Sequence, residues 1–167
     1  LRITTCGSRR WCSMPYDVIG ARIVLDDPAI KRLGEATARD MVESAAQIIV
    51  ADAKGSFTGG GGEYGEPAKG NEYPKGVNGD IVHVASAPGQ PPAVDTGRLR
   101  ANLDMVMMPG EPRALIGTPV DYAPFLEFGT SRMKPRPLWR TVIYRYHGNN
   151  NLAYKAARHL KARGRLR

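Results

Sequence analysis

A segment of roughly 25 residues in the first third of the chain has apolar side chains along one side only. The stripe repeats at steps of three and four positions and consists of Ile30, Leu33, Thr37, Met41, Ala45, Ile48 and Ile49. This period predicts one long amphipathic helix that packs in the core and lines no cofactor site. Asp26, Asp27 and Pro28 favour the helix start, because Asp caps free N–H groups and Pro suits the first turn. Gly55 is typical of its end.

Shorter segments predict strands and further helices. β-branched and alternating residues predict strands at 18–25 and 80–86. Two apolar segments, 105–108 and 114–117, flank the turn residues Pro109-Gly110-Glu111-Pro112 and predict a hairpin. Short helical segments are expected at 98–103, 138–147 and 152–162.

The chain of 167 residues fits a single domain. We expect a basic N-terminal arm over 1–14, one domain over 15–147 and a basic C-terminal helix or tail over 148–167. Residues 55–79 include nine glycines, which makes ordering costly in entropy and predicts a long mobile loop. A phosphate-binding loop is excluded there, because no Gly-Lys-Ser/Thr precedes a helix. A loop of this kind more often becomes ordered upon assembly with a partner.

Positive charge is concentrated at the C-terminal end. The formal charge is +8, with 24 Lys and Arg against 16 Asp and Glu. Eleven of the basic residues and no acidic residue lie in 131–167, which leaves 13 basic and 16 acidic residues in the rest of the chain. A cationic end suits a polyanion, either nucleic acid or an acidic protein surface. A solvated helix face followed by a frayed tail explains the same pattern.

The residue patterns of common catalytic and metal sites are missing from the sequence. The three histidines form no HExxH or HxH pattern, no Gly-x-Ser-x-Gly turn is present, and the carboxylates are scattered. Cys6 and Cys12 form neither a CxxC motif nor a disulfide framework, which favours a reducing compartment. No segment has the roughly 18 apolar residues of a bilayer span, and no secretory signal pattern is present. We therefore expect no enzyme activity, no catalytic, metal-binding or cofactor-binding residues, and no membrane association.

Two segments in the second half of the chain resemble the signatures of one known family. The first, 92–100, resembles a DTG-x-LR signature through Asp95, Thr96, Gly97, Arg98, Leu99 and Arg100. The second, 116–138, resembles a YA-xx-EFGT…RPFL signature through Tyr122, Ala123, Pro124, Phe125, Glu127, Phe128, Gly129, Thr130, Arg136 and Pro137. The family is the small neck, or tail-completion, proteins of long-tailed double-stranded DNA bacteriophages, also described as head–tail connector or minor tail components. The two motifs in this order are specific, although Leu138-Trp139 replaces the commoner Phe-Leu pair.

The resemblance implies an α+β fold in which a long helix in the N-terminal half packs on a small antiparallel sheet. The long glycine-rich loop and the basic C-terminal helices complete this expected architecture. The resemblance further implies a structural, non-catalytic virion protein, made in the cytoplasm of the host bacterium, whose copies assemble as a homo-oligomeric ring of six in the neck. Its expected neighbours are head-completion or connector proteins and the tail terminator or tail tube. Genomic double-stranded DNA is expected to make passing contact with the ring.

The sixteen residues of the two signatures are the candidate interface residues. The aromatic members of the second signature supply the large apolar area that interface centres favour. Gly97 and Gly129 suit tight turns or close backbone approach. We expect Glu127 to pair with an arginine such as Arg98 or Arg136, within or between subunits. The alternative is that these residues only hold the loops of the monomer together.

Two other functions are compatible with the sequence. A tail terminator ring that caps the tail tube belongs to the same structural class, and the motifs do not separate it from a neck ring. A small basic DNA-binding protein is suggested by the charge alone. A dedicated DNA binder presents a basic recognition helix or a platform of stacking aromatic residues, whereas the aromatic residues here lie mostly upstream of the basic segment.

Overall fold

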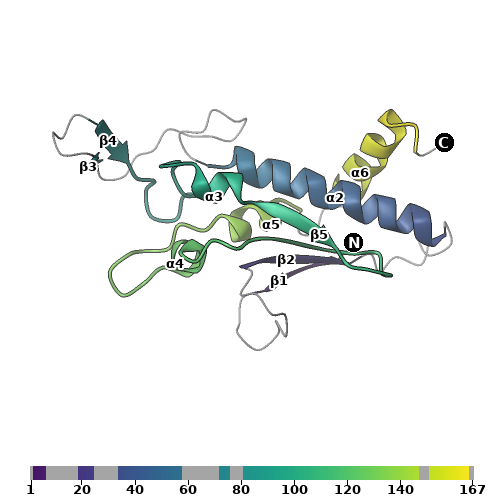
Figure 1. The fold of residues 1–167 in the computed structure, drawn as a ribbon, viewed down its shortest axis with the longest axis horizontal. Helices are drawn as coiled ribbons and strands as arrows, with labels where there is room; N and C mark the ends of the chain where they lie inside the picture. Colours follow the sequence, from purple (N-terminus) through teal and green to yellow (C-terminus); the bar gives the residue numbers. More distant parts are fainter. Residues whose placement is uncertain are drawn as a thin grey trace.

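The long amphipathic helix and the strands beside it form an α+β fold in the computed structural model, which describes residues 2–6, 19–24, 34–57, 72–75, 81–146 and 151–165. This helix, α2 (Glu35–Gly55), runs along the long axis of the molecule (Figure 1). It ends at Gly55, as predicted, and the N–H of the next residue, Ser56, donates to the Ala53 carbonyl at 3.2 Å. The helix begins at Glu35, after the non-helical Gly34 with a φ of 89°, so the predicted start at residues 26–28 is wrong for α2; residues 26–33 themselves lie outside the described residues.

Four antiparallel strands form the main sheet in the order β1-β2-β6-β5. They are β1 (Arg2–Cys6), β2 (Ile19–Val24), β5 (Asp104–Met107) and β6 (Arg113–Thr118). The strand predicted at 18–25 is confirmed as β2, and the predicted hairpin is formed by β5 and β6. The prediction of a separate N-terminal arm is wrong for residues 2–6, because β1 pairs along its whole length with β2 at the edge of the sheet.

Helices cover one face of this sheet. Ala114, Ile116 and Thr118 of β6 are buried, whereas Asp104 and Val106 of β5 are exposed. Helix α2 packs on β2, β5 and β6, and α5 (Trp139–Tyr146) packs on β1, β2 and α2. An antiparallel sheet with one packed and one exposed face is a common arrangement, and it explains the alternating burial along β5 and β6.

The buried side of α2 is broader than the predicted stripe. Ile48, a predicted member of the stripe, is only half-buried. Helix α6 (Asn151–Ala162) packs on α2 as well, so α2 has neighbours on more than one side. A single stripe does not predict this second contact. The α2 residues without any exposed surface are Val42, Ala46, Ile49 and Ala53.

The remaining elements lie at one end of the molecule (Figure 1). They are α3 (Arg98–Ala101), α4 (Ala123–Phe128) and a two-stranded sheet of β3 (Glu72–Lys75) and β4 (Ile81–Val84). The prediction of a mobile loop over 55–79 is wrong at β3, which is a strand. Residues 58–71 and 76–79 lie outside the described residues. The helices predicted at 138–147 and 152–162 are confirmed as α5 and α6. Within the described ranges, no helix combines the length and hydropathy needed to cross a membrane.

Candidate functional site

The first signature segment forms a bend that leads into α3. Gly97 is the N-cap residue of α3 and has a φ of 79°. The Thr96 Oγ1 accepts a hydrogen bond from the Arg98 N–H at 3.3 Å, which closes the bend in front of the helix. Leu99 is buried in the core, whereas Asp95 is exposed and Arg100 is half-buried. The segment is therefore anchored by its leucine and presents its polar residues at the surface.

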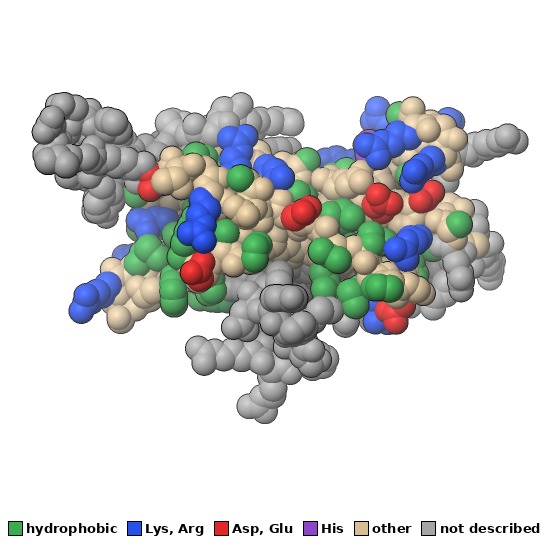
Figure 2. Space-filling model, viewed as in Figure 1, with side chains coloured by type: hydrophobic (Ala, Val, Ile, Leu, Met, Phe, Trp, Pro, Cys, Tyr) green, Lys and Arg blue, Asp and Glu red, His purple; other side chains and the backbone are tan. Residues whose placement is uncertain are grey.

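The second signature segment begins with α4, which has a buried and an exposed side. Ala123 and Glu127 are buried, and Pro124 lies in the first turn, where its missing N–H costs nothing. Three aromatic side chains lie on the exposed side at intervals of three residues, and we call them the aromatic stripe: Tyr122, Phe125 and Phe128. They are 38%, 55% and 47% exposed, and hydrophobic side chains gather around α4 in Figure 2. Aromatic area of this kind is enriched at protein interfaces.

The Glu127 carboxylate caps the first turn of α5. Its Oε2 accepts the N–H groups of Leu138 at 2.8 Å and of Trp139 at 3.0 Å, and its Oε1 accepts the N–H of Arg140 at 2.9 Å. A buried carboxylate at a helix N-terminus satisfies donors that have no partner inside the helix and interacts favourably with the helix dipole. Glu127 thus joins α4 to α5.

Within one subunit, the expected pairing of Glu127 with Arg98 or Arg136 is therefore wrong. Arg98 pairs instead with Asp121 at 3.6 Å, and both side chains are largely exposed. The Arg136 Nε donates to the Ser86 carbonyl at 3.0 Å. The sequence shows that a carboxylate and two arginines lie in the same motifs, but not that backbone N–H groups occupy the carboxylate first.

Residues 129–137 form a closed loop between α4 and α5. Gly129 has a φ of 76°, and a Cβ atom there would lie 2.7 Å from the Met133 carbonyl oxygen and 2.9 Å from the Pro135 nitrogen. The Thr130 Oγ1 accepts the Met133 N–H at 3.0 Å, which closes the loop from within. The Arg136 N–H donates to the Leu126 carbonyl at 2.7 Å. Only glycine fits the first position, because every other residue brings a Cβ into this contact.

Pro137 completes this loop at the start of α5. Its carbonyl accepts the Thr141 hydroxyl at 2.9 Å, which adds a side-chain bond to the first turn of the helix. Together with Glu127, Gly129, Thr130 and Arg136, this residue makes contacts within the chain. This part of the second signature thus holds the monomer together, whereas its aromatic stripe points outward.

The two signature segments line one cavity of about 470 Å³. The first contributes Pro92 to Arg100, and the second contributes Tyr122, Leu126 and Arg136. Phe57, which follows α2, and Ala85-Ser86, which follow β4, complete the lining. Segments that are distant in the sequence thus meet at a single site. Such a volume lies within the range of binding pockets for side chains or small molecules.

One buried polar group in the cavity wall has no partner. Ser86 has no exposed surface, and its hydroxyl makes no hydrogen bond among the described residues. Ser86, Phe57 and Leu126 were not candidates from the sequence. No motif marks a serine that follows a short strand, and only the three-dimensional contact with the signature segments reveals it.

In the basic C-terminal segment, some arginines are half-buried, whereas other arginines and the lysines are exposed. Arg136 and Arg145 are half-buried, and the Arg145 Nη1 donates to the Ser56 hydroxyl at 3.0 Å. The cations of α6 and the turn after it are exposed, and Figure 2 shows basic side chains gathered over this helix. They are Lys155, Arg158, Lys161, Arg163 and Arg165.

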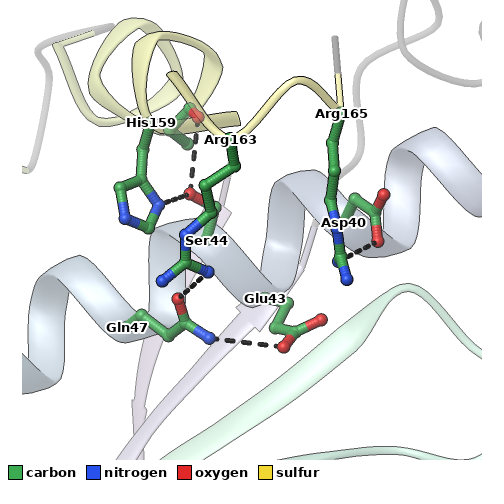
Figure 3. A network of polar contacts seen from close by, with 8 residues as sticks. Asp40, Glu43, Ser44, Gln47, His159, Arg163 and Arg165 are labelled. Atoms are coloured by element: carbon green, nitrogen blue, oxygen red, sulfur yellow. Dashed lines mark hydrogen bonds and ion pairs between the residues drawn. The ribbon is translucent and has the colours of Figure 1, made fainter. Parts of the chain in front are cut away.

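Polar contacts attach this basic end to α2 (Figure 3). The Arg165 Nη1 lies 3.3 Å from the Asp40 Oδ1, and the Arg163 Nη1 donates to the Gln47 Oε1 at 3.3 Å. An exposed ion pair such as that of Arg165 contributes little to stability, and the Arg163 side chain bonds to a neutral amide, so both arginines stay available to a polyanion. In the part of the chain that the structure describes, no group of three or more His, Cys, Asp or Glu side chains is arranged to hold a metal ion.

Comparisons with known proteins find no match to the chain. This holds for protein-family models, for curated proteins and for solved structures. The function proposed below therefore depends on the two signature segments and on the surfaces that they form.

Proposed function

We propose that this chain is a structural, non-catalytic subunit of a ring in the neck of a long-tailed double-stranded DNA bacteriophage, where it joins the DNA-filled head to the tail. The observation that carries the proposal is that the two segments with the family resemblance line one cavity at one end of the molecule. The ring has six copies, as the resemblance implies. Connector proteins lie on its head side, and the tail terminator or tail tube lies on its other side.

The aromatic stripe supports an interface in this region. Phe125 and Phe128 are 55% and 47% exposed, so they add little to the core of the monomer. The buried side of the same helix is fixed by Glu127, which keeps the stripe in one orientation. A rigid apolar surface loses little conformational entropy upon binding and is therefore suited to assembly.

The proposal is tested by negative-stain microscopy of phage particles assembled without this gene product. We expect DNA-filled heads beside separate, complete tails. Normally joined virions would overturn the proposal. Tails that continue past their normal length would assign the chain to the tail terminator, because an uncapped tube continues to grow.

A paired set of variants tests the stripe itself. The double variant Phe125→Ser, Phe128→Ser is expected to retain the helical circular dichroism of the parent and to fail to restore infectivity. Tyr154→Ser is the control, because Tyr154 is 62% exposed but lies on α6. Equal infectivity of the double variant and the control would exclude the stripe from assembly.

DNA binding is the second candidate function, and the exposed cations of α6 favour it. From residue 151 to residue 165 the chain has five Lys or Arg and no acidic residue. Neutralising Lys155, Arg158 and Lys161 with Gln would weaken duplex binding and flatten its salt dependence. Neutralising the exposed Arg132, Lys134 and Arg140 removes the same number of charges and is the control for charge alone. Tight binding to free duplex at physiological salt, lost only in the α6 variant, would favour this second function.

A further inference from the structure

The turn between β5 and β6, residues 108–112, lies at the end of the sheet opposite to α3 and α4 (Figure 1). It is held in shape by several hydrogen bonds. The Met108 N–H donates to the Arg113 carbonyl at 2.9 Å, and the Arg113 N–H donates to the Glu111 carbonyl at 2.8 Å. From α2, the Arg39 Nη1 donates to the Met108 carbonyl at 3.2 Å. The turn therefore has a fixed conformation before it meets any partner.

This turn combines one carboxylate with apolar neighbours. Glu111 is exposed and pairs with Arg113 at 3.0 Å, in an ion pair whose side chains are 50% and 40% exposed. Such a pair is weak in water and is readily exchanged for another partner. Met108, Pro109 and Pro112 provide the apolar surface, and hydrophobic side chains gather at this end in Figure 2.

The cavity at the opposite end has complementary chemistry. The Arg136 guanidinium is oriented by the bond from its Nε to the Ser86 carbonyl, and no other described residue pairs with it. The Ser86 hydroxyl is fully buried and has no partner among the described residues, which is costly unless a ligand supplies one. Phe57 and Leu99 give the lining an apolar character. A carboxylate on an apolar segment fits this combination, because arginine binds carboxylates through charge-assisted hydrogen bonds.

We propose that the β5–β6 turn of one copy docks into the cavity of a second copy, so that the Glu111 carboxylate meets the Arg136 guanidinium and the Ser86 hydroxyl. The inference rests on the proposed ring and deepens it by naming the two surfaces that alternate around it. Because these surfaces lie at opposite ends of the subunit, the contact is head-to-tail. Repetition of a head-to-tail contact with a closing rotation produces a ring.

The aromatic stripe has a defined role in this contact. Tyr122 belongs both to the stripe and to the cavity lining, so the stripe continues the rim of the cavity. Apolar side chains around a buried polar contact exclude water and strengthen it. The stripe of one subunit therefore packs beside the incoming turn of the next.

Cross-linking tests the docking directly. Cys6 and Cys12 are replaced by Ser, and Pro109→Cys is combined with Thr96→Cys, which keeps Glu111 intact, since Pro109 is exposed in the same turn and Thr96 is exposed and lines the cavity. A short bismaleimide is applied to the purified full chain at high concentration and to assembled phage particles. We expect a ladder of covalent oligomers that ends at the number of subunits in the ring. Each single-cysteine variant yields dimers at most.

The control pair combines Thr96→Cys with Tyr154→Cys, since Tyr154 is exposed on α6. A ladder from this pair as strong as from the test pair would overturn the docking. Absence of the ladder in both purified protein and particles would overturn it as well. Particles that require the protein for joining but give no ladder would leave the ring function standing and reject only this contact. Cross-links from the Thr96→Cys cavity to a different virion protein would assign the cavity to that protein.

Charge variants test the chemistry of the contact. They are measured in the same Pro109→Cys, Thr96→Cys background. Glu111→Arg is expected to lower the yield of the ladder at least about tenfold, because it places two cations together. Arg113→Gln is the matched control, since it removes the partner of Glu111 within the chain and should preserve or raise the yield. Ser86→Ala should lower the yield without lowering the stability of the isolated chain, and an unchanged yield would remove Ser86 from the contact.

Discussion

Ser44 and His159 are 115 positions apart in the sequence, yet the Ser44 Oγ lies 2.7 Å from the His159 Nδ1. Their contact joins α2 to α6 and is the most buried part of the polar network in Figure 3, since Ser44 is 2% exposed. The Ser44 hydroxyl also donates to the Ala156 carbonyl at 3.4 Å. The pair fixes how α6 sits on α2.

Ser44→Ala should therefore lower the free energy of unfolding by about 1–2 kcal/mol, because it leaves a partly buried ring nitrogen without a partner. Ser86→Ala is the matched control, since Ser86 is also buried but its hydroxyl has no partner among the described residues. We expect that control to be neutral or slightly stabilising. Urea denaturation measures both. Equal losses at the two positions would contradict the assigned difference in hydrogen bonding.

Glu127→Ala should lower the free energy of unfolding by about 3 kcal/mol. It removes a charged acceptor from three N–H groups at the buried start of α5. Glu127→Gln should lower the free energy of unfolding by a smaller amount, because its amide keeps one acceptor oxygen. Some loss remains, because the amide also turns a donor toward the helix. Guanidinium denaturation followed by the fluorescence of Trp139 is a suitable measurement. A Gln variant as stable as the parent would show that the charge of Glu127 does not matter.

Gly129→Ala should destabilise the chain by more than about 3 kcal/mol. Its backbone lies in a region that only glycine adopts without strain, and the new methyl group meets backbone atoms at 2.7 and 2.9 Å. Gly110→Ala separates these two effects, because Gly110 has a φ of 72° but open space around it. We expect Gly110→Ala to lower the free energy of unfolding by about 1–2 kcal/mol. Thermal unfolding of both variants gives the difference, and similar losses would mean that the loop yields to the added methyl group.

Tyr146→Phe should cost about 1 kcal/mol, because the Tyr146 hydroxyl donates to the Asp52 carboxylate and ties α5 to α2. Tyr154→Phe is the control, since Tyr154 is 62% exposed on α6 and retains its aromatic ring near Arg158. Urea denaturation of both variants is the measurement. If Tyr154→Phe lowers the free energy of unfolding as much as Tyr146→Phe does, the loss does not come from the bond to Asp52.

The sequence predicts most elements of the fold because their signals are local. The turn at Pro109-Gly110-Glu111-Pro112 separates two apolar segments, and the structure places β5 and β6 there. Strand β1 was missed because its partner β2 lies in another segment, and pairing between segments leaves no local pattern.

The members of the candidate site were predicted in part: eight of the sixteen candidate residues line the cavity, whereas Phe57, Ser86 and Leu126 line it without having been candidates. Both signature segments contribute to the cavity, as a common site requires. The partner of Glu127 was predicted incorrectly, because charge favours an arginine while geometry offers three backbone N–H groups. Ser86 left no signal at all, since a lone serine is ordinary in any sequence. Contacts of this kind depend on the distance between elements, which periodicity does not encode.

The cap of α5 by Glu127 also determines how the molecule carries mechanical load. A pull on the aromatic stripe acts on α4, and three parallel hydrogen bonds transmit it to the first turn of α5, whose Trp139 and Val142 lie in the core. The force thus bypasses the longer path through residues 129–137. Bonds loaded in parallel share the force and yield together, whereas bonds loaded in series open one at a time. A subunit built in this way resists stretching between its outer surface and its core.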